Sequence, residues 1–417
     1  MGLDNMYLII ILGIIVFQYL LSCVVKILNI KALSSELPKE FSDTFDQDKY
    51  LKSQEYTKTN TKFSFLTSTF SLILNLVFIL GGFYNIVDLY ARGFGYGPEV
   101  TGLVFFGLLF IITDLVNIPF SLYKTFVIEE RYGFNKTTLK TFWTDKVKGY
   151  FLTILIGIPV LYFTLYFFSQ YTEYGWLYVW LFLVIFSIVM QPIFTTFIAP
   201  MFNKFTPLDD GPLLQKIKDY LLKVNFPVQR LEVVDGSKRS SHSNAYFSGI
   251  GKYKRIALFD TLLEQMDDNE ILSIIAHEVG HYKLKHIYSG IILSSIQSGI
   301  MLYILSLFIN FEPLFAAFGM QEGNLSIYAS LVFFSILYSP ISLIVGIFFS
   351  FISRKNEFSA DAYSAKTAQM PESLISGLKK LSKENLSNLT PHWLNVFLNY
   401  SHPPVLERIR ILKTYIK

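Results

Sequence analysis

WLYVWLFLVIFSIVMQPIFTTFIA, residues 176–199, contains no charged side chain. An α-helix rises about 1.5 Å per residue, so about 20 apolar residues cross the roughly 30 Å hydrocarbon core of a bilayer. Backbone polar groups find no water in that core, and a helix satisfies them within the segment itself. This stretch is therefore predicted to be a membrane-spanning helix.

Six further apolar stretches meet the same criterion: residues 7–25, 65–86, 101–123, 151–168, 287–309 and 327–352. Stretch 151–168 is the shortest and holds Pro159. Pro340, in the last stretch, would bend its helix unless a neighbouring group binds the carbonyl that proline leaves free. Charged residues make up only 16% of the 417-residue chain, against about a quarter in soluble domains. These features predict an all-α membrane protein with seven transmembrane helices.

The loop charges predict an orientation and a division of the chain. Lys and Arg gather in 26–64, 124–150, 200–286 and after residue 353, whereas the other connections hold almost none. Basic loops stay in the cytosol, so the N-terminus is expected outside or in the lumen and the C-terminus inside. The predicted regions are spans one to five (1–200), a cytosolic catalytic region (201–286), spans six and seven (287–352) and a cytosolic C-terminal region (353–417). The net charge is +4, and the basic residues are spread over the loops without forming a basic run, so no nucleic-acid partner is expected.

One cytosolic stretch carries metal chemistry, the motif His277-Glu278-Val279-Gly280-His281. Asp267 and Glu270 precede it with the spacing of a capping box, which predicts the start of a helix. His277 and His281 then share one helical face and can bind a single Zn²⁺, with Glu278 placed as general base. The alternative, a helix with two surface histidines, is less favoured because this pattern seldom arises by chance.

Catalytic zinc keeps three protein ligands and one open position, so a third ligand is expected from elsewhere. Glu357 and Asp361 follow the last apolar stretch, again four residues apart. We predict that Glu357 binds the one zinc ion per chain and that Asp361 orients a ligand imidazole. Taken alone, the same two residues would suit a solvated helix end.

Three short strands are predicted at residues 231–234, 244–247 and 255–259. The strand containing Asn244, Ala245 and Tyr246 could pair with an extended peptide as an added strand. His402, followed by two prolines, either stabilises a developing oxyanion or is a loop histidine bonded to the backbone. His286 is interpreted as an interfacial polar residue on the motif helix rather than as a ligand.

Several further motifs point to a known family when taken together and in order. They are FVIEERYGFNK (126–136), APMFNKFTPL (199–208), DGSKRSSHSNAYF (235–247), SHPP (401–404) and ERI (407–409). With the metal motif, they resemble the Ste24-type CaaX prenyl proteases, integral-membrane zinc proteases of peptidase family M48 that are related to the HtpX group.

The resemblance implies seven helices around a water-filled chamber and removal of the last three residues, aaX, from a prenylated CaaX protein or peptide. It places zinc on His277, His281 and Glu357, makes Glu278 the base, and suggests Asn244 and His402 as substrate or transition-state contacts. The expected partners are this substrate and a lipid bilayer, with no oligomer required. The chain is shorter than expected of eukaryotic members, which favours a bacterial inner membrane over the endoplasmic reticulum.

Two alternatives stay open from the sequence. An HtpX-like enzyme would cut damaged membrane proteins, although that group has fewer spans and lacks the 126–136 type of loop. A transporter or scaffold could instead hold a structural metal, and Asp114 is the obvious charged residue within the apolar stretches.

Overall fold

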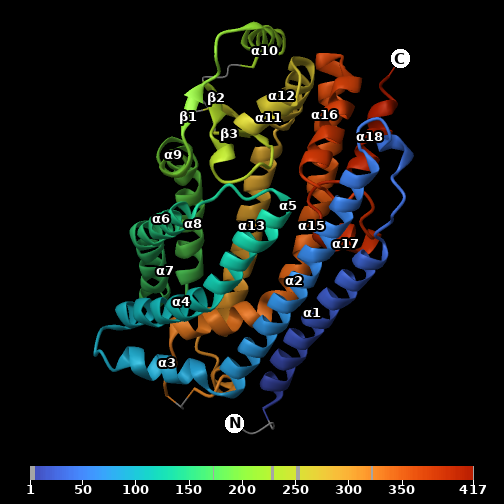
Figure 1. Cartoon of the computed structure of the whole chain (residues 1–417). Helices are drawn as coiled ribbons and strands as arrows, with labels where there is room; N and C mark the ends of the chain where they lie inside the picture. The colour runs from blue at the N-terminus through green and yellow to red at the C-terminus, as the bar shows by residue number, and fades with distance from the viewer. Residues whose placement is uncertain (1–4, 172, 227–229, 250–253, 321–322, 417) are drawn as a thin grey trace.

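Seven long helices form the body of the molecule (Figure 1). The structure, a computed structural model, describes residues 5–171, 173–226, 230–249, 254–320 and 323–416. Within these residues, the helices long and apolar enough to cross a membrane are Met6–Lys31 (α1), Gln47–Leu80 (α2), Pro98–Tyr132 (α4 and α5), Leu139–Gln170 (α6 and α7), Gly175–Phe202 (α8 and α9), His286–Phe308 (α13) and Ile327–Ala368 (α15). The predicted seven spans are confirmed.

Three of these spans contain a widened π-helical turn, at Lys124–Glu129, Thr153–Gly157 and Phe194–Ile198. The second turn ends two residues before Pro159, and the third ends two residues before Pro200. A proline ring clashes with the carbonyl four residues earlier and donates no hydrogen bond to it. Widening the turn relieves that conflict without breaking the span.

The seventh span continues through Pro340. The carbonyl that this proline cannot bond is that of Ile336, and the Ser339 hydroxyl donates to it at 2.7 Å. A neighbouring side chain thus binds the free acceptor, which is the condition under which the helix was expected to survive.

The predicted second stretch, 65–86, is wrong at its far end. Helix α2 ends at Leu80, and Gly82 then adopts a left-handed φ of 65°. Helix α3 (Phe83–Arg92) follows as a separate amphipathic helix. The apolar composition runs across this turn, so hydropathy alone did not reveal it.

A small four-stranded sheet lies at one end of the molecule (Figure 1). Its strands are β1 (Phe205–Pro207), β2 (Arg230–Val234), β3 (Ala245–Ser248) and β4 (Arg255–Phe259), in the order β1-β2-β4-β3. Strands β2 and β4 are parallel, and the other pairs are antiparallel. The three predicted strands are confirmed to within a residue, while β1 was missed because it is short and ends in proline. Strand β3 forms one edge of the sheet.

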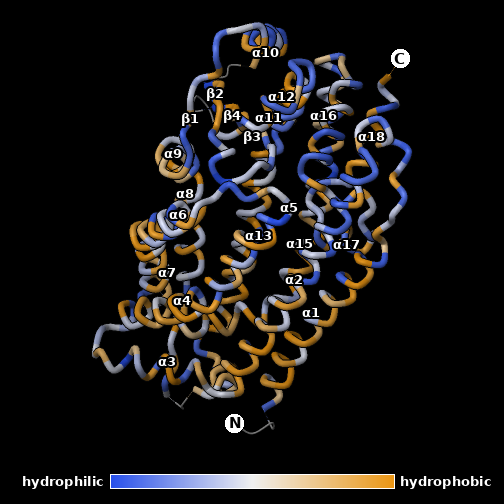
Figure 2. Tube along the Cα trace, in the orientation of Figure 1, coloured by the Kyte–Doolittle hydropathy of each residue, from blue (hydrophilic) through white to orange (hydrophobic). Residues whose placement is uncertain are grey.

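Shorter helices lie at and near this end: α10 (Pro212–Lys223), α11 (Asp260–Gln265), α12 (Asp268–Lys283), α16 (Pro371–Glu384), α18 (Val405–Lys413) and, packed against α15 and α1, α17 (Trp393–Asn399). Figure 2 shows hydrophobic residues along the long helices and hydrophilic ones concentrated at the sheet end. One hydrophobic core joins β4, α12, α16 and α18 there, with Ile256, Ile275 and Ile409 fully buried. A second core at the opposite end joins α1, α3, α4, α15 and the short α14 (Glu312–Ala317).

Asp88 is a fully buried carboxylate in the second core. It accepts hydrogen bonds from the Tyr328 hydroxyl at 2.6 Å and from Arg92 Nε at 2.7 Å. Asp88→Ala should destabilise the protein by roughly 2–3 kcal/mol, because it leaves the buried Tyr328 phenol without an acceptor and removes the carboxylate partner of Arg92. Thermal unfolding in detergent measures this change, with exposed Asp210→Ala as the control. Equal melting temperatures for the two variants would contradict it.

Candidate metalloprotease site

Helix α12 begins where the capping box predicted. The Asp267 carboxylate accepts from the backbone amides of Asn269 and Glu270 at 2.8 and 3.1 Å, and Glu270 accepts from the Asp267 amide at 2.9 Å. The side chains of Ser376 and Lys380, both on α16, donate to Glu270 as well. The start of the motif helix is therefore fixed both by its own backbone and by a neighbouring helix.

Gly280 allows α12 to approach the end of α15 closely. A Cβ atom at this position would lie 3.2 Å from both the Cα and the carbonyl oxygen of Ala360. Real Cβ atoms rarely approach backbone this closely, so a larger residue would push the two helices apart. The glycine inside the motif thus brings the two histidines on α12 next to Glu357 on α15.

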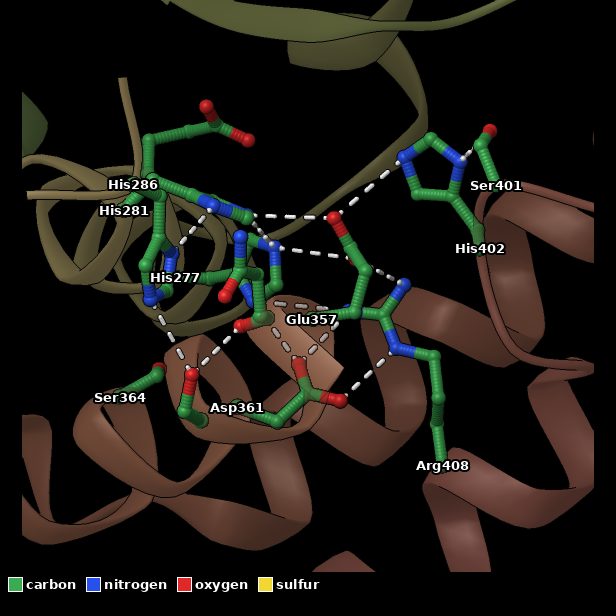
Figure 3. A network of polar contacts seen from close by, with 12 residues as sticks. His277, His281, His286, Glu357, Asp361, Ser364, Ser401, His402 and Arg408 are labelled. Atoms are coloured by element: carbon green, nitrogen blue, oxygen red, sulfur yellow. Dashed lines mark hydrogen bonds and ion pairs between the residues drawn. The ribbon is translucent and has the colours of Figure 1, made fainter. Parts of the chain in front are cut away.

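His277, His281 and Glu357 converge on one point (Figure 3). A ligating atom from each lies within 4.8 Å of the others. Glu357 Oε1 is 3.2 Å from His281 Nε2, and Glu357 Oε2 is 3.5 Å from His277 Nε2. Two imidazoles and one carboxylate, from two helices, could hold one metal ion, and they match the donor set expected of a catalytic zinc site.

Glu357 Oε2 gives an independent sign that this group suits a metal. The atom is buried and accepts no hydrogen bond from the described residues, although Arg408 Nη1 lies 3.3 Å away. A buried carboxylate oxygen without a hydrogen bond is costly. A cation at the centre of the three side chains would compensate for it.

Asp361 lies behind His277, where it was predicted to orient a ligand. Its Oδ1 is 2.8 Å from His277 Nδ1, which leaves Nε2 facing the metal group. Arg408 on α18 binds both oxygens of this carboxylate, at 2.6 and 2.8 Å. Burial lowers the pKa of His277, but Asp361 and Glu357 outweigh burial and raise it to about 9. The arrangement holds the ring in place, as expected of a partner that orients a metal-binding imidazole.

Arg408 is a site residue for which the sequence predicted no role. Its motif, Glu407-Arg408-Ile409, contributed only to the family resemblance. The available signal was the family resemblance of this motif, because the burial of the neighbouring Ile409 is visible only in the structure. Nothing in the local sequence shows that Asp361, 47 residues earlier, is its partner.

His286 also belongs to the surroundings of the site. Helix α12 ends at Lys283, Lys285 adopts a left-handed φ of 61°, and α13 begins at His286. The prediction that His286 lies on the motif helix is therefore wrong, because His286 is the first residue of the next helix. The turn places its Nδ1 3.0 Å from His281 Nδ1, and its Nε2 is 3.3 Å from Ser359 Oγ. His286 therefore contacts His281, a predicted ligand, and its interpretation as an interfacial polar residue stays a prediction.

The predicted base and substrate strand lie next to each other. Glu278 Oε2 accepts a hydrogen bond from the Phe247 amide of β3 at 3.3 Å. Ala245 and Tyr246 are in β3, whereas Asn244 lies just before the strand and is exposed. The Asn244 carbonyl still accepts from Phe259 at 3.1 Å, so the ladder continues through it.

His402 approaches the group from the other side, in the loop before α18 (Figure 3). Its Nε2 is 3.4 Å from Glu357 Oε1, its Nδ1 is 3.0 Å from Ser401 Oγ, and its side chain is 66% exposed. This position is compatible with a role at the transition state. The loop alternative, bonding to backbone, finds no support among the described contacts, where its polar partners are side chains.

Comparison with known proteins decides the family. Residues 26–204 match the model described as "CAAX prenyl protease N-terminal, five membrane helices", and residues 207–416 match "Peptidase family M48". The chain belongs to the Ste24-type CAAX prenyl proteases of family M48. It is thus a membrane metalloendopeptidase. The family uses a metal, and the group of His277, His281 and Glu357 could bind one.

Relatives of this Ste24-type protease match over nearly their whole length. The mouse CAAX prenyl protease 1 homolog is 35% identical over 91% of this chain and 89% of its own. CAAX prenyl protease 1 of Saccharomyces cerevisiae is 34% identical over 92% of this chain and 89% of its own. The crystal structure of S. mikatae Ste24p superposes with a TM-score of 0.92, with 33% identity, covering 97% of this chain and 99% of that one. The fold class predicted from the sequence is confirmed.

Proposed function

We propose that this Ste24-type protease is a zinc endopeptidase that removes the C-terminal aaX tripeptide from prenylated CaaX proteins or peptides. The observation that carries the proposal is the convergence of His277, His281 and Glu357 beside an edge strand. The names of the relatives supply the substrate class. A bound zinc ion would polarise the scissile carbonyl and acidify water.

The residues of this chain divide the remaining work. Glu278 accepts a proton from the attacking water and delivers it to the leaving amine. His402 donates a hydrogen bond to the oxyanion. Asp361 and Arg408 hold the His277 ring at a fixed angle.

Substrate binding has two supports in the structure. The outer edge of β3, which pairs with no further strand among the described residues, offers backbone groups to an extended peptide that would add to the sheet, although its Phe247 amide already donates to Glu278. A cavity of about 350 Å³ beside Glu278 and His281 has a mainly apolar surface, to which Phe247, Leu293 and Phe349 contribute. Such a cavity suits the aliphatic side chains of an aaX sequence.

Two alternatives are disfavoured by particular findings. The match of residues 26–204 to the five-helix CAAX prenyl protease domain favours CaaX processing over HtpX-like quality control. Asp114, the residue that suggested transport, is held by Lys146 Nζ at 2.6 Å and by the Tyr150 hydroxyl at 2.5 Å. An ion pair of this kind joins helices and leaves no free carboxylate for a transported ion.

The orientation, the membrane and the inner chamber stay predictions. We propose that the metal group faces the cytosol, supported by the basic loops at its end of the molecule. The start of α1 and the sheet lie at opposite ends in Figure 1, as that orientation requires.

Cleavage assays test the proposed function. The purified protein should release the tripeptide from a farnesylated CaaX peptide at least about tenfold faster than from the unfarnesylated peptide, since the apolar chain adds binding energy. A chelator should abolish turnover, and added zinc should restore it. Equal turnover of the two peptides would overturn the prenyl assignment, and chelator-resistant turnover would overturn the metal mechanism.

A further inference from the structure

A second cavity lies between α1, α2 and the segment from α16 to α17. Its volume is about 610 Å³, and its lining is rich in neutral polar side chains, among them Asn60, Asn385, Asn388 and Asn399. Amide and hydroxyl groups suit the backbone of a bound peptide and are poorly suited to a prenyl chain. We refer to it as the asparagine cavity.

Lys26 supplies the single charge among the described residues that line this cavity. It lies in the last two turns of helix α1, just past the predicted span 7–25, where a long basic side chain reaches the polar end of the molecule. Its ammonium donates to the Ser64 carbonyl at 3.0 Å and to Ser68 Oγ at 2.8 Å. An ammonium has three N–H groups, so one remains. No carboxylate of the described residues pairs with Lys26, and the cavity therefore attracts an anion.

Asn388 supplies a second sign of a missing ligand. Its Nδ2 is buried and has no hydrogen-bond partner among the described residues, while its Oδ1 accepts from the Thr390 amide at 3.0 Å. Because Nδ2 has almost no accessible surface in this conformation, the Asn388 amide must turn before it can meet an acceptor oxygen in the cavity. Lys26 describes a ligand with a negative charge, and a turned Asn388 adds a donor for its carbonyl or carboxylate oxygens.

The asparagine cavity adjoins the candidate site at two places. Asn385 lines it and also binds the backbone of Ser243, accepting from its amide at 3.1 Å and donating to its carbonyl at 3.2 Å. Ser243 leads directly into Asn244 and β3. Tyr400 lines the cavity as well, two residues before His402.

The direction of an added strand then decides which part of a substrate reaches this cavity. Antiparallel pairing is the more stable arrangement. A substrate antiparallel to β3 runs from the Ser248 end towards Asn244, so residues after the cut bond extend past Asn244 towards Ser243 and Asn385. An extended tripeptide spans about 10 Å, a length that a cavity of this size can hold.

We propose that the asparagine cavity binds the leaving aaX peptide and that Lys26 pairs with its terminal carboxylate. The inference rests on the proposed function and adds to it a determinant for the free C-terminus of the substrate. It explains how an endopeptidase could cut at a fixed distance from a chain end. Lys26 acts here as a specificity residue rather than as a catalytic one.

Two matched substrates test the role of Lys26: a farnesylated CaaX peptide with a free C-terminus, and the same peptide as a C-terminal carboxamide. The native enzyme should favour the acid by about 30-fold in kcat/KM, the scale of a charge-assisted hydrogen bond. Lys26→Met should remove this preference and Lys26→Arg should keep most of it. Exposed Lys31→Met, on the same helix, serves as the control and should match the native enzyme. An unchanged preference in Lys26→Met would overturn the proposal.

A binding measurement separates this inference from the proposed function. Calorimetry on the zinc-loaded Glu278→Gln protein should detect the tripeptide Val-Ile-Met but only weak binding of its carboxamide, and Lys26→Met in that background should abolish the difference. If this difference is found while farnesylated peptides are cleaved no faster than unfarnesylated ones, only the prenyl assignment fails. If prenyl-dependent cleavage is found but acid and carboxamide bind equally, the carboxylate subsite is wrong.

Discussion

Glu278→Gln is expected to lower kcat by at least about a thousandfold while the protein keeps its metal, because a carboxamide cannot accept the proton of the attacking water. The substitution is nearly isosteric. The Phe247 amide, 3.3 Å from Glu278 Oε2, can still find an acceptor in the glutamine oxygen, so β3 should stay in place. His277, His281 and Glu357 are untouched, which separates loss of the base from loss of the metal.

The measurement combines single-turnover cleavage of a farnesylated peptide with metal analysis of the same sample. Glu264→Gln is the control, because this glutamate is exposed on α11 and should leave both quantities unchanged. Cleavage by the Glu278→Gln protein within tenfold of the native rate would exclude Glu278 as the base. Loss of metal would instead give Glu278 a structural role in the site.

Local patterns allowed the helical body and part of the site to be predicted from the sequence. Each span is a continuous apolar run, so it can be predicted from its own sequence without knowing which helices pack beside it. The capping box and the two histidines of the motif lie within one helix, whose period fixes their relative positions. Glu357 and Asp361 were found by asking what a two-histidine site lacks. The structure brings these residues together; their ligand and catalytic roles stay predictions.

The features that were missed depend on packing between distant segments. Arg408 acquires its place only when α18 packs beside α15, which brings it onto Asp361. His286 contacts His281 only because a left-handed residue, Lys285, breaks the helix between them. The asparagine cavity is a further case, since Lys26 and Asn388 come from opposite ends of the chain. Periodicity carries no information about such pairs.

The site combines rigid and accessible parts in a way that suits an endopeptidase. Asp361 is fully buried and His277 nearly so, and their network with Arg408 holds the His277 ring in place. His402 and Asn244, which are proposed to meet the substrate, are exposed. A peptide can therefore reach the metal group while the groups behind the ligands stay fixed.

Glu357→Ala is expected to weaken zinc binding by more than about a hundredfold and to abolish turnover with it. Loss of an outer partner typically weakens metal sites tenfold to a hundredfold, and loss of a ligand should cost more. The fold should survive, because Arg408 keeps both hydrogen bonds to Asp361 and α12 keeps its contact with α15 through Gly280. Metal analysis after dialysis against a weak chelator measures the loss, and circular dichroism reports the fold.

Two further variants serve as comparisons for Glu357→Ala: a conservative replacement and a control at an exposed glutamate. Glu357→Gln keeps a neutral oxygen ligand and should retain part of the metal, since the site loses charge but not shape. Glu372→Ala removes an exposed glutamate at the start of α16 and should retain all of it. Full metal content in Glu357→Ala would mean that the third ligand lies elsewhere. His402 would then be the first candidate, because its Nε2 already lies 3.4 Å from Glu357 Oε1 and could reach the position that the carboxylate leaves.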